Sequence, residues 1–158
     1  MTSTHGHRSG DGAHTASQVT TLSSISDEMV RLYKEQFGRG PTRARSNWAG
    51  PDTLVVILED TLTPAERNLV RLGEHQRLRD TRMFFQYATV RGFCEPVERL
   101  TGRTVRAFIS GIDTEADGLS TELFVLHPEG YTGPSRIERA EARRDAGPSG
   151  AQGPTATS

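Results

Sequence analysis

The sequence predicts an α+β fold of two layers, in which a four-stranded sheet is covered by helices on one face. Apolar residues are concentrated between Ser24 and Pro128. Within that stretch, a segment with helical spacing is followed by two strand-like segments, and this order of helix and hairpin then repeats. Helices and hairpins that are apolar on one side bury those sides by packing as two layers.

The 158-residue chain is expected to form one domain with a tail at each end. Residues 1–22 are rich in Ser, Thr, Gly and His, and they are predicted to be a disordered tail because they cannot bury enough apolar surface. Residues 130–158 are predicted to be a second tail, charged at first and then of low complexity. The domain itself therefore spans residues 24–128.

The first half of the domain begins with a helix near Ser24, whose hydroxyl suits an N-cap. Apolar residues recur at helical spacing as far as Phe37, and Gly38 is expected to end the helix. Two strand-like runs follow at 42–48 and 53–59, joined by Gly-Pro turn residues. The second run is apolar on both faces, which predicts a central strand.

The second half opens with Thr63-Pro64-Ala65-Glu66, a capping box with proline at the first helical position. This helix could break at Gly73, and a longer helix is predicted from about Glu74 to Leu100, kinked at Pro96. Its predicted buried stripe consists of Met83, Tyr87, Val90, Phe93, Val97 and Leu100, with Leu78 and Phe85 on a flank. Residues 103–113 and 119–127 then form a second predicted hairpin.

Composition narrows the class of protein. The net charge is −1, from 19 basic and 20 acidic residues, which argues against a globally basic nucleic-acid binder. Cys94 is the only cysteine, so an intrachain disulfide is impossible, and a reducing, cytoplasmic location is expected. No apolar run approaches the roughly 20 residues of a spanning helix, and the N-terminus has no signal-peptide pattern. The chain is therefore expected to be soluble and to reach a membrane only through a partner, without direct insertion.

Five residues are candidates for contact with a partner. Arg71, His75, Arg79 and Arg82 are spaced by four, four and three residues, so on one continuous helix they would form a basic stripe. Such a stripe could bind an acidic protein or phosphates, or it could be an ordinary solvated helix face. Trp48 ends the first predicted strand, where it could be an exposed anchor for a partner or a partly buried hairpin residue.

No motif predicts catalysis or a bound group. The acidic segment Asp113–Gly118 is similar to the start of a calcium loop, but Phe124 stands where the bidentate glutamate is needed, so a hairpin turn is favoured. His75 and His127 have no serine or carboxylate at the spacing of a catalytic triad. We therefore predict no catalytic residue, no metal ligand and no cofactor.

Three motifs together resemble one known family. They are Gly38-Arg39-Gly40-Pro41, Leu62-Thr63-Pro64-Ala65-Glu66-Arg67 and Leu100-Thr101-Gly102-Arg103, in this order. The resemblance is to the MpsC-like family of small bacterial proteins, labelled Na+-translocating membrane potential-generating system, and it covers residues 24–127. It implies association with a cation- or bicarbonate-transporting membrane system, and it carries over no catalytic residues.

These observations favour a non-enzymatic protein-interaction module whose partner is a set of membrane transport subunits. A homodimer is also expected, because the segments 42–48 and 119–127 could offer unpaired strand edges. Two other functions remain open. One is a regulator that binds nucleic acid through the Arg-rich helix, and the other is an enzyme whose site is assembled from residues distant in sequence.

Overall fold

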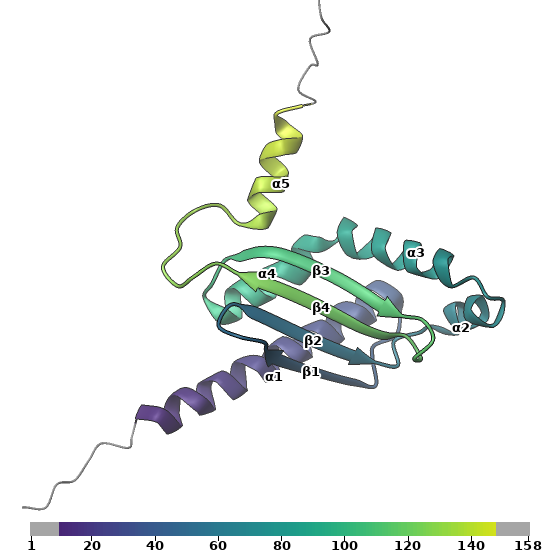
Figure 1. The fold of residues 1–158 in the computed structure, drawn as a ribbon, viewed down its shortest axis with the longest axis horizontal. Coiled ribbons are helices and arrows are strands. Elements are labelled where there is room, and N and C mark those ends of the chain that lie inside the picture. Colours follow the sequence, from purple (N-terminus) through teal and green to yellow (C-terminus); the bar gives the residue numbers. More distant parts are fainter. Residues whose placement is uncertain (1–9, 148–158) are drawn as a thin grey trace, which may run out of the picture.

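The computed structural model describes residues 10–147, which form helices on one side of a four-stranded antiparallel sheet (Figure 1). The elements are, in chain order, α1 (Gly10–Phe37), β1 (Arg43–Trp48), β2 (Thr53–Glu59), α2 (Pro64–Arg71), α3 (His75–Ala88), α4 (Val90–Thr101), β3 (Val105–Asp113), β4 (Leu119–Leu126) and α5 (Arg136–Asp145). The predicted α+β class is confirmed, as is the covering of one sheet face by helices.

The two hairpins join through their second strands, which gives the strand order β1-β2-β4-β3. Val55 of β2 lies opposite Leu123 of β4, and every neighbouring pair is antiparallel. The predicted free edge at residues 119–127 is therefore wrong, because β4 is paired on both sides. The free edges belong to β1 and β3.

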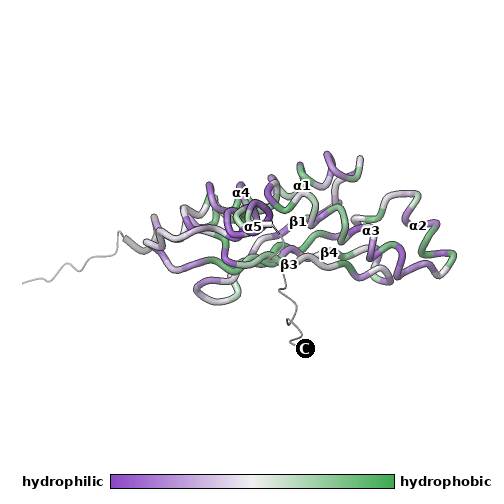
Figure 2. Tube along the Cα trace, turned by 90° about the horizontal axis from the view of Figure 1, so that it is seen from above, coloured by the Kyte–Doolittle hydropathy of each residue, from purple (hydrophilic) through white to green (hydrophobic). Residues whose placement is uncertain are grey.

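The core lies between the sheet and the helices α1 and α4, which Figure 2 shows on the same side of the strands. Alternate residues of β2 are buried, as a strand with one covered face requires. Most of the buried apolar residues form one cluster: Ile25, Met29, Tyr33, Leu54, Val56, Leu58, Phe93, Cys94, Val97, Val105, Phe108, Phe124, Leu126 and Ile137.

Helix α1 begins earlier than predicted. It starts at Gly10, whereas Ser24 was the predicted start, so residues 10–22 are helical and do not form the expected disordered tail. Thr20 and Thr21 each donate a side-chain hydrogen bond to the carbonyl four residues earlier, so their hydroxyls are satisfied on the helix surface. The expectation of disorder for residues 1–9 lies outside the described residues.

The second predicted tail also contains a helix that belongs to the fold. Ser135 and Glu138 form a capping box that opens α5, and Ile137 is buried in the core cluster. Arg139 Nη2 donates to the carbonyl oxygen of Arg106 on β3 at 2.9 Å. Residues 130–147 are therefore docked on the domain, while residues 148–158 lie outside the described part of the chain.

The long helix predicted for residues 74–100 is two helices. The break is at Thr89, whose backbone leaves the helical conformation with φ −113° and ψ 23°, and whose hydroxyl donates to the carbonyl of Phe85 at 2.8 Å. Pro96 lies inside α4. The break predicted at Gly73 is confirmed, since α2 ends at Arg71 and α3 begins at His75.

We predict that Gly118→Ala destabilises the fold by about 2–3 kcal/mol, as measured by urea denaturation. Gly118 has a φ of +72°, and an added Cβ would lie 2.5 Å from Cγ of the buried Leu62. Gly50 is the control, because its φ is +95° but an added Cβ would meet nothing within 4 Å. Gly50→Ala should therefore cost only about 1 kcal/mol. Equal costs for the two variants would contradict the role of the Leu62 contact.

Candidate functional site

Helix α3 turns two polar side chains inward beside Leu78 and exposes several large apolar side chains. Its buried residues are Leu78, Arg82 and Gln86, whereas Met83 and Phe85 are exposed. The predicted buried stripe is therefore wrong for Met83, because its neighbour Arg82 faces the interior in its place. In this orientation α3 makes buried polar contacts with the sheet on its inner side and exposes apolar side chains on its outer side.

Arg82 is buried, and Nε and Nη2 of its guanidinium are hydrogen-bonded in the interior, whereas Nη1 is buried with no hydrogen-bond partner among residues 10–147. Its side chain is 1% exposed, its Nε lies 2.5 Å from Glu66 Oε1, and its Nη2 donates to the carbonyl of Thr61 at 2.8 Å. The guanidinium carbon lies 3.9 Å from the centre of the Phe37 ring, a cation–π distance. Burial alone would raise the pKa of Glu66, but hydrogen bonds from Arg82 and Thr63 outweigh it and hold that pKa below its usual value. Glu66 and Arg82 therefore form a buried ion pair.

A second buried acid, Glu122 of β4, lies beneath α1 and α3. Tyr33 donates to Glu122 Oε1 at 2.6 Å, and Gln86 Nε2 donates to the same oxygen at 3.0 Å. The hydroxyl of Ser110, which lies opposite Glu122 on β3, is also buried, and its interaction with the Glu122 carboxyl favours the ionised form. Burial raises the pKa of Glu122 to about 8, against the opposing effect of the Tyr33 hydrogen bond. The carboxyl group is therefore predominantly protonated at neutral pH.

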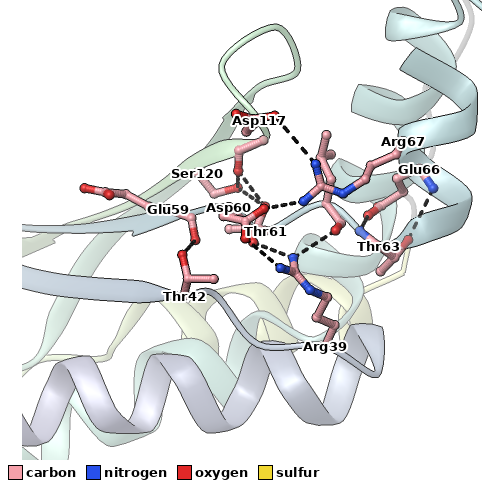
Figure 3. Close-up of polar contacts among 12 residues, drawn as sticks. Arg39, Thr42, Glu59, Asp60, Thr61, Thr63, Glu66, Arg67, Asp117 and Ser120 are labelled. Carbon is pink, nitrogen blue, oxygen red and sulfur yellow. Dashed lines mark hydrogen bonds and ion pairs between the residues drawn. The ribbon is translucent and has the colours of Figure 1, made fainter. Parts of the chain in front are cut away.

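Asp60 connects three segments at the end of β2, as Figure 3 shows. Its carboxylate pairs with Arg39, which follows α1, at 2.6 Å, and with Arg67 of α2. These hydrogen bonds, with that from Arg39 the largest effect, lower the pKa of Asp60 below its usual value. Next to it, Thr61 Oγ1 donates to the carbonyl of Gly118 at 2.6 Å. The segment that leads from β2 to α2 is therefore held by α1, α2 and the β3–β4 turn together.

The four residues of the predicted basic stripe do not form one exposed surface. Arg71 is exposed at the end of α2, beyond the Gly73 break. His75 Nδ1 lies 2.8 Å from the hydroxyl of Thr114, and Arg79 Nη2 donates to the same hydroxyl at 3.2 Å. Arg82 is buried, so its predicted place on a partner-binding surface is wrong. The helix break and the ion pair with Glu66 are the physical reasons.

Trp48 is partly buried and packs against the core cluster. The guanidinium of Arg103 lies over its ring at 5.8 Å from the centroid. Trp48 also lines a hollow of about 430 Å³ between α1 and the β1–β2 turn. Of the two interpretations left open from the sequence, the partly buried hairpin residue is the one that the structure has.

Comparison with known families gives one match. A family model described as "Na+-translocating membrane potential-generating system (MpsC)" matches residues 17–127. The chain belongs to the MpsC family. The match begins inside α1, seven residues before the boundary predicted from the motifs. No curated protein and no solved structure matches the chain significantly.

The motifs that indicated the MpsC family support the fold. Arg39 and Arg67 bind Asp60, and Thr63 and Glu66 cap α2. Arg103 donates to the carbonyls of His127 and Pro51, which joins the two hairpin ends. These residues are thus engaged in contacts within the chain.

No helix within residues 10–147 of this MpsC-family chain combines the length and the apolar character that crossing a membrane would require. The same range contains no group of three His, Cys, Asp or Glu side chains that could hold a metal ion. Cys94 is buried among apolar residues, and burial raises the pKa of its thiol to about 12. At neutral pH this thiol is therefore protonated and a poor nucleophile.

The surface that sequence reasoning missed is the outer face of α3. Met83 and Phe84 are exposed there, Phe84 to 71%, and with Asp80, Tyr87 and Ala88 they line a shallow hollow of about 440 Å³. These residues follow the helical spacing of one face, so their pattern is that of a buried stripe. The correct orientation of α3 could have been inferred only from Leu78, because Arg82 and Gln86 follow it at spacings of four residues and so lie on the same helix face. We refer to Asp80, Met83, Phe84, Tyr87 and Ala88 as the α3 apolar face.

Proposed function

We propose that this protein is a non-enzymatic interaction module that serves as an accessory component of a membrane cation or bicarbonate transport system. The description of its family, which links it to a Na+-translocating membrane potential-generating system, supports a role of this kind. A chain of this type would act on the cytoplasmic side of the membrane by binding transport subunits.

The observation that carries the proposal is the α3 apolar face. Phe84 is 71% exposed, although a phenylalanine gains about 1.5–3 kcal/mol from full burial. Contiguous exposed apolar residues mark interaction sites, and aromatic side chains are frequent among the residues that contribute most to binding. Arg82 and Gln86 face the interior, so the helix is held in the orientation that exposes Phe84.

The test is affinity capture of the full-length protein from detergent-solubilised cells, followed by identification of the retained membrane subunits. We expect the double variant Met83→Ser/Phe84→Ser to lose at least about 90% of the retained transport subunits, which corresponds to more than 1.4 kcal/mol. Leu72→Ser is the matched control, because Leu72 is 75% exposed and lies outside the α3 apolar face. It should retain them.

Two outcomes would contradict the proposal. One is that wild type and both variants retain the same transport subunits, which would place the contact elsewhere. The other is that wild type retains nuclease-sensitive material in place of membrane subunits, with an affinity that falls steeply as salt is raised, which would support the nucleic-acid alternative.

A further inference from the structure

The face of the sheet opposite α1 and α4 is uncovered by the helices of residues 10–147. Figure 1 looks onto this face, with α1 and α4 behind the strands. Its centre is apolar and consists of Val55 and Ile57 from β2 and Leu123 and Val125 from β4, all partly exposed. Ile109 of β3, which lies opposite Leu123, is 55% exposed. A single sheet with one face unpaired normally places polar residues on that face, so this apolar centre requires an explanation.

The charged residues of this open face are separated across the sheet. Arg43 and Arg45 project from β1, where Arg45 pairs with Glu59 at 2.7 Å. Asp113 lies at the same end of the sheet on β3, the opposite edge strand, because it is opposite Leu119. Leu58 pairs with Ser120, so the next residues, Glu59 and Leu119, are also in register. One row across the sheet therefore contains four residues, namely Arg43, Glu59, Leu119 and Asp113. The row therefore begins with Arg43 at one edge, beside Glu59, and ends with Asp113 at the other edge. Asp113 is exposed, and its Oδ1 accepts hydrogen bonds from the backbone N–H groups of Glu115 and Ala116.

We propose that two copies of this chain pair face to face through this surface, related by a two-fold axis parallel to the strands. Rotation about that axis places β1 of one copy over β3 of the other, so Arg43 lies over the partner subunit's Asp113, and this contact occurs twice. It also places Val55 over the partner subunit's Leu123. Gly111, which lies in the row of Arg45, has no side chain and leaves room for that arginine.

Charge complementarity is what selects a second copy and this axis. A two-fold axis in the plane of the sheet but perpendicular to the strands would stack β1 on β1, and it would oppose arginine with arginine. Sheets that pack in this way lie about 10 Å apart at an angle near −30°, which leaves space for the branched aliphatic side chains to interdigitate. The sheet face is thus complementary to a second copy of itself in its apolar centre and in its charge, as a two-fold interface requires.

The expected dimer is weak. Four strands about 4.8 Å apart and about seven residues long give a footprint of roughly 400–500 Å² per subunit. Stable interfaces bury about 800 Å² per partner, so this footprint is that of a weak dimer that forms only at high protein concentration. The proposed dimer leaves the α3 apolar face free. The experiment on dimerisation and the experiment on partner binding therefore test separate surfaces, and either proposal can be wrong while the other is right.

The test is sedimentation equilibrium of the full chain over roughly 1–300 µM, a range chosen for a weak interface. We expect wild type to dimerise and Leu123→Lys to be monomeric throughout, because it places a charge at the centre of the apolar surface. Phe84→Lys is the control, since it introduces the same charge at an exposed apolar residue on α3, and it should dimerise like wild type. Circular dichroism melting confirms that each variant is folded.

A charge reversal tests the axis without altering the apolar centre. Arg43→Asp and Asp113→Arg should each weaken the dimer by about tenfold, and the double variant should recover most of the wild-type affinity. A wild type that stays monomeric at the highest concentration would overturn the proposal. Covering of the face by a terminal segment of the same chain would give this same result. A dimer that survives Leu123→Lys would indicate edge-to-edge pairing through β1 and would likewise overturn it.

Discussion

Arg82→Met is expected to lower the free energy of unfolding by about 3–5 kcal/mol, the usual cost of removing one partner from a buried ion pair. Methionine retains much of the aliphatic stem, so the loss reports on the charge. Without Arg82, the Glu66 carboxylate keeps its place at the first turn of α2 but has no cation to offset its burial. The carbonyl of Thr61 also loses a donor. Urea denaturation measures the loss directly.

The double variant Arg82→Met/Glu66→Gln separates the ion pair from packing. Glutamine at residue 66 can still accept the hydrogen bond from Thr63 N, which lies 2.8 Å from Glu66 Oε2. We therefore expect the double variant to be more stable than Arg82→Met alone by about 1–3 kcal/mol, because it removes the buried carboxylate that has lost its cation. Arg91→Met is the surface control, and it should cost less than about 1 kcal/mol although Arg91 pairs with Glu95 and Glu141. A cost for Arg82→Met as small as that of Arg91→Met would show that the buried pair contributes little.

Glu122→Gln is expected to stabilise the protein increasingly as the pH rises. The folded-state pKa of Glu122 is about 8, above the ordinary value of 4.5, so the folded protein binds a proton that the unfolded chain releases. Between those two pH values, ionisation of the unfolded chain lowers the wild-type free energy of unfolding by up to about 1.4 kcal/mol per pH unit. The loss begins near pH 4.5 and levels off above pH 8. Glutamine does not titrate, so this contribution is absent from the variant.

The measurement is the difference in unfolding free energy between Glu122→Gln and wild type at several pH values. Subtracting the two profiles cancels the other titrating groups. We expect the difference to increase by about 3 kcal/mol between pH 5 and pH 7.5. Glu95→Gln, at an exposed position on α4, should show no such increase. Parallel profiles for Glu122→Gln and wild type would contradict the raised pKa of Glu122.

Local patterns predicted much of the fold correctly. The capping box at Thr63, the break at Gly73 and the two hairpins are encoded by residues close together in the sequence, and each is present. Predictions failed where local composition is ambiguous. The polar residues 10–22 are helical although they have little apolar character. Helix α5 is docked by Ile137, the one large apolar side chain in a charged segment, and by the hydrogen bond from Arg139 to β3.

The candidate site could be predicted less well than the fold. The spacing of Arg71, His75, Arg79 and Arg82 is consistent with an exposed basic stripe, but spacing does not show which face of a helix turns inward. Glu66 and Glu122 decide that question, because they offer buried acceptors to Arg82 and Gln86. These acids are 16 and 36 residues away in sequence from the side chains they bind. No short motif contains both partners.

The α+β class, the family and the two hairpins could be predicted because caps, turns and apolar periodicity depend on neighbouring residues. The central position of β4 in the sheet, the exposure of Phe84 on α3 and the open apolar face of the sheet could not be predicted in this way. Each of these depends on contacts between residues far apart in the chain. The contacts that decide them are buried ion pairs and hydrogen bonds between distant residues and the pairing of the two hairpins in one sheet. A local sequence pattern contains information about neither.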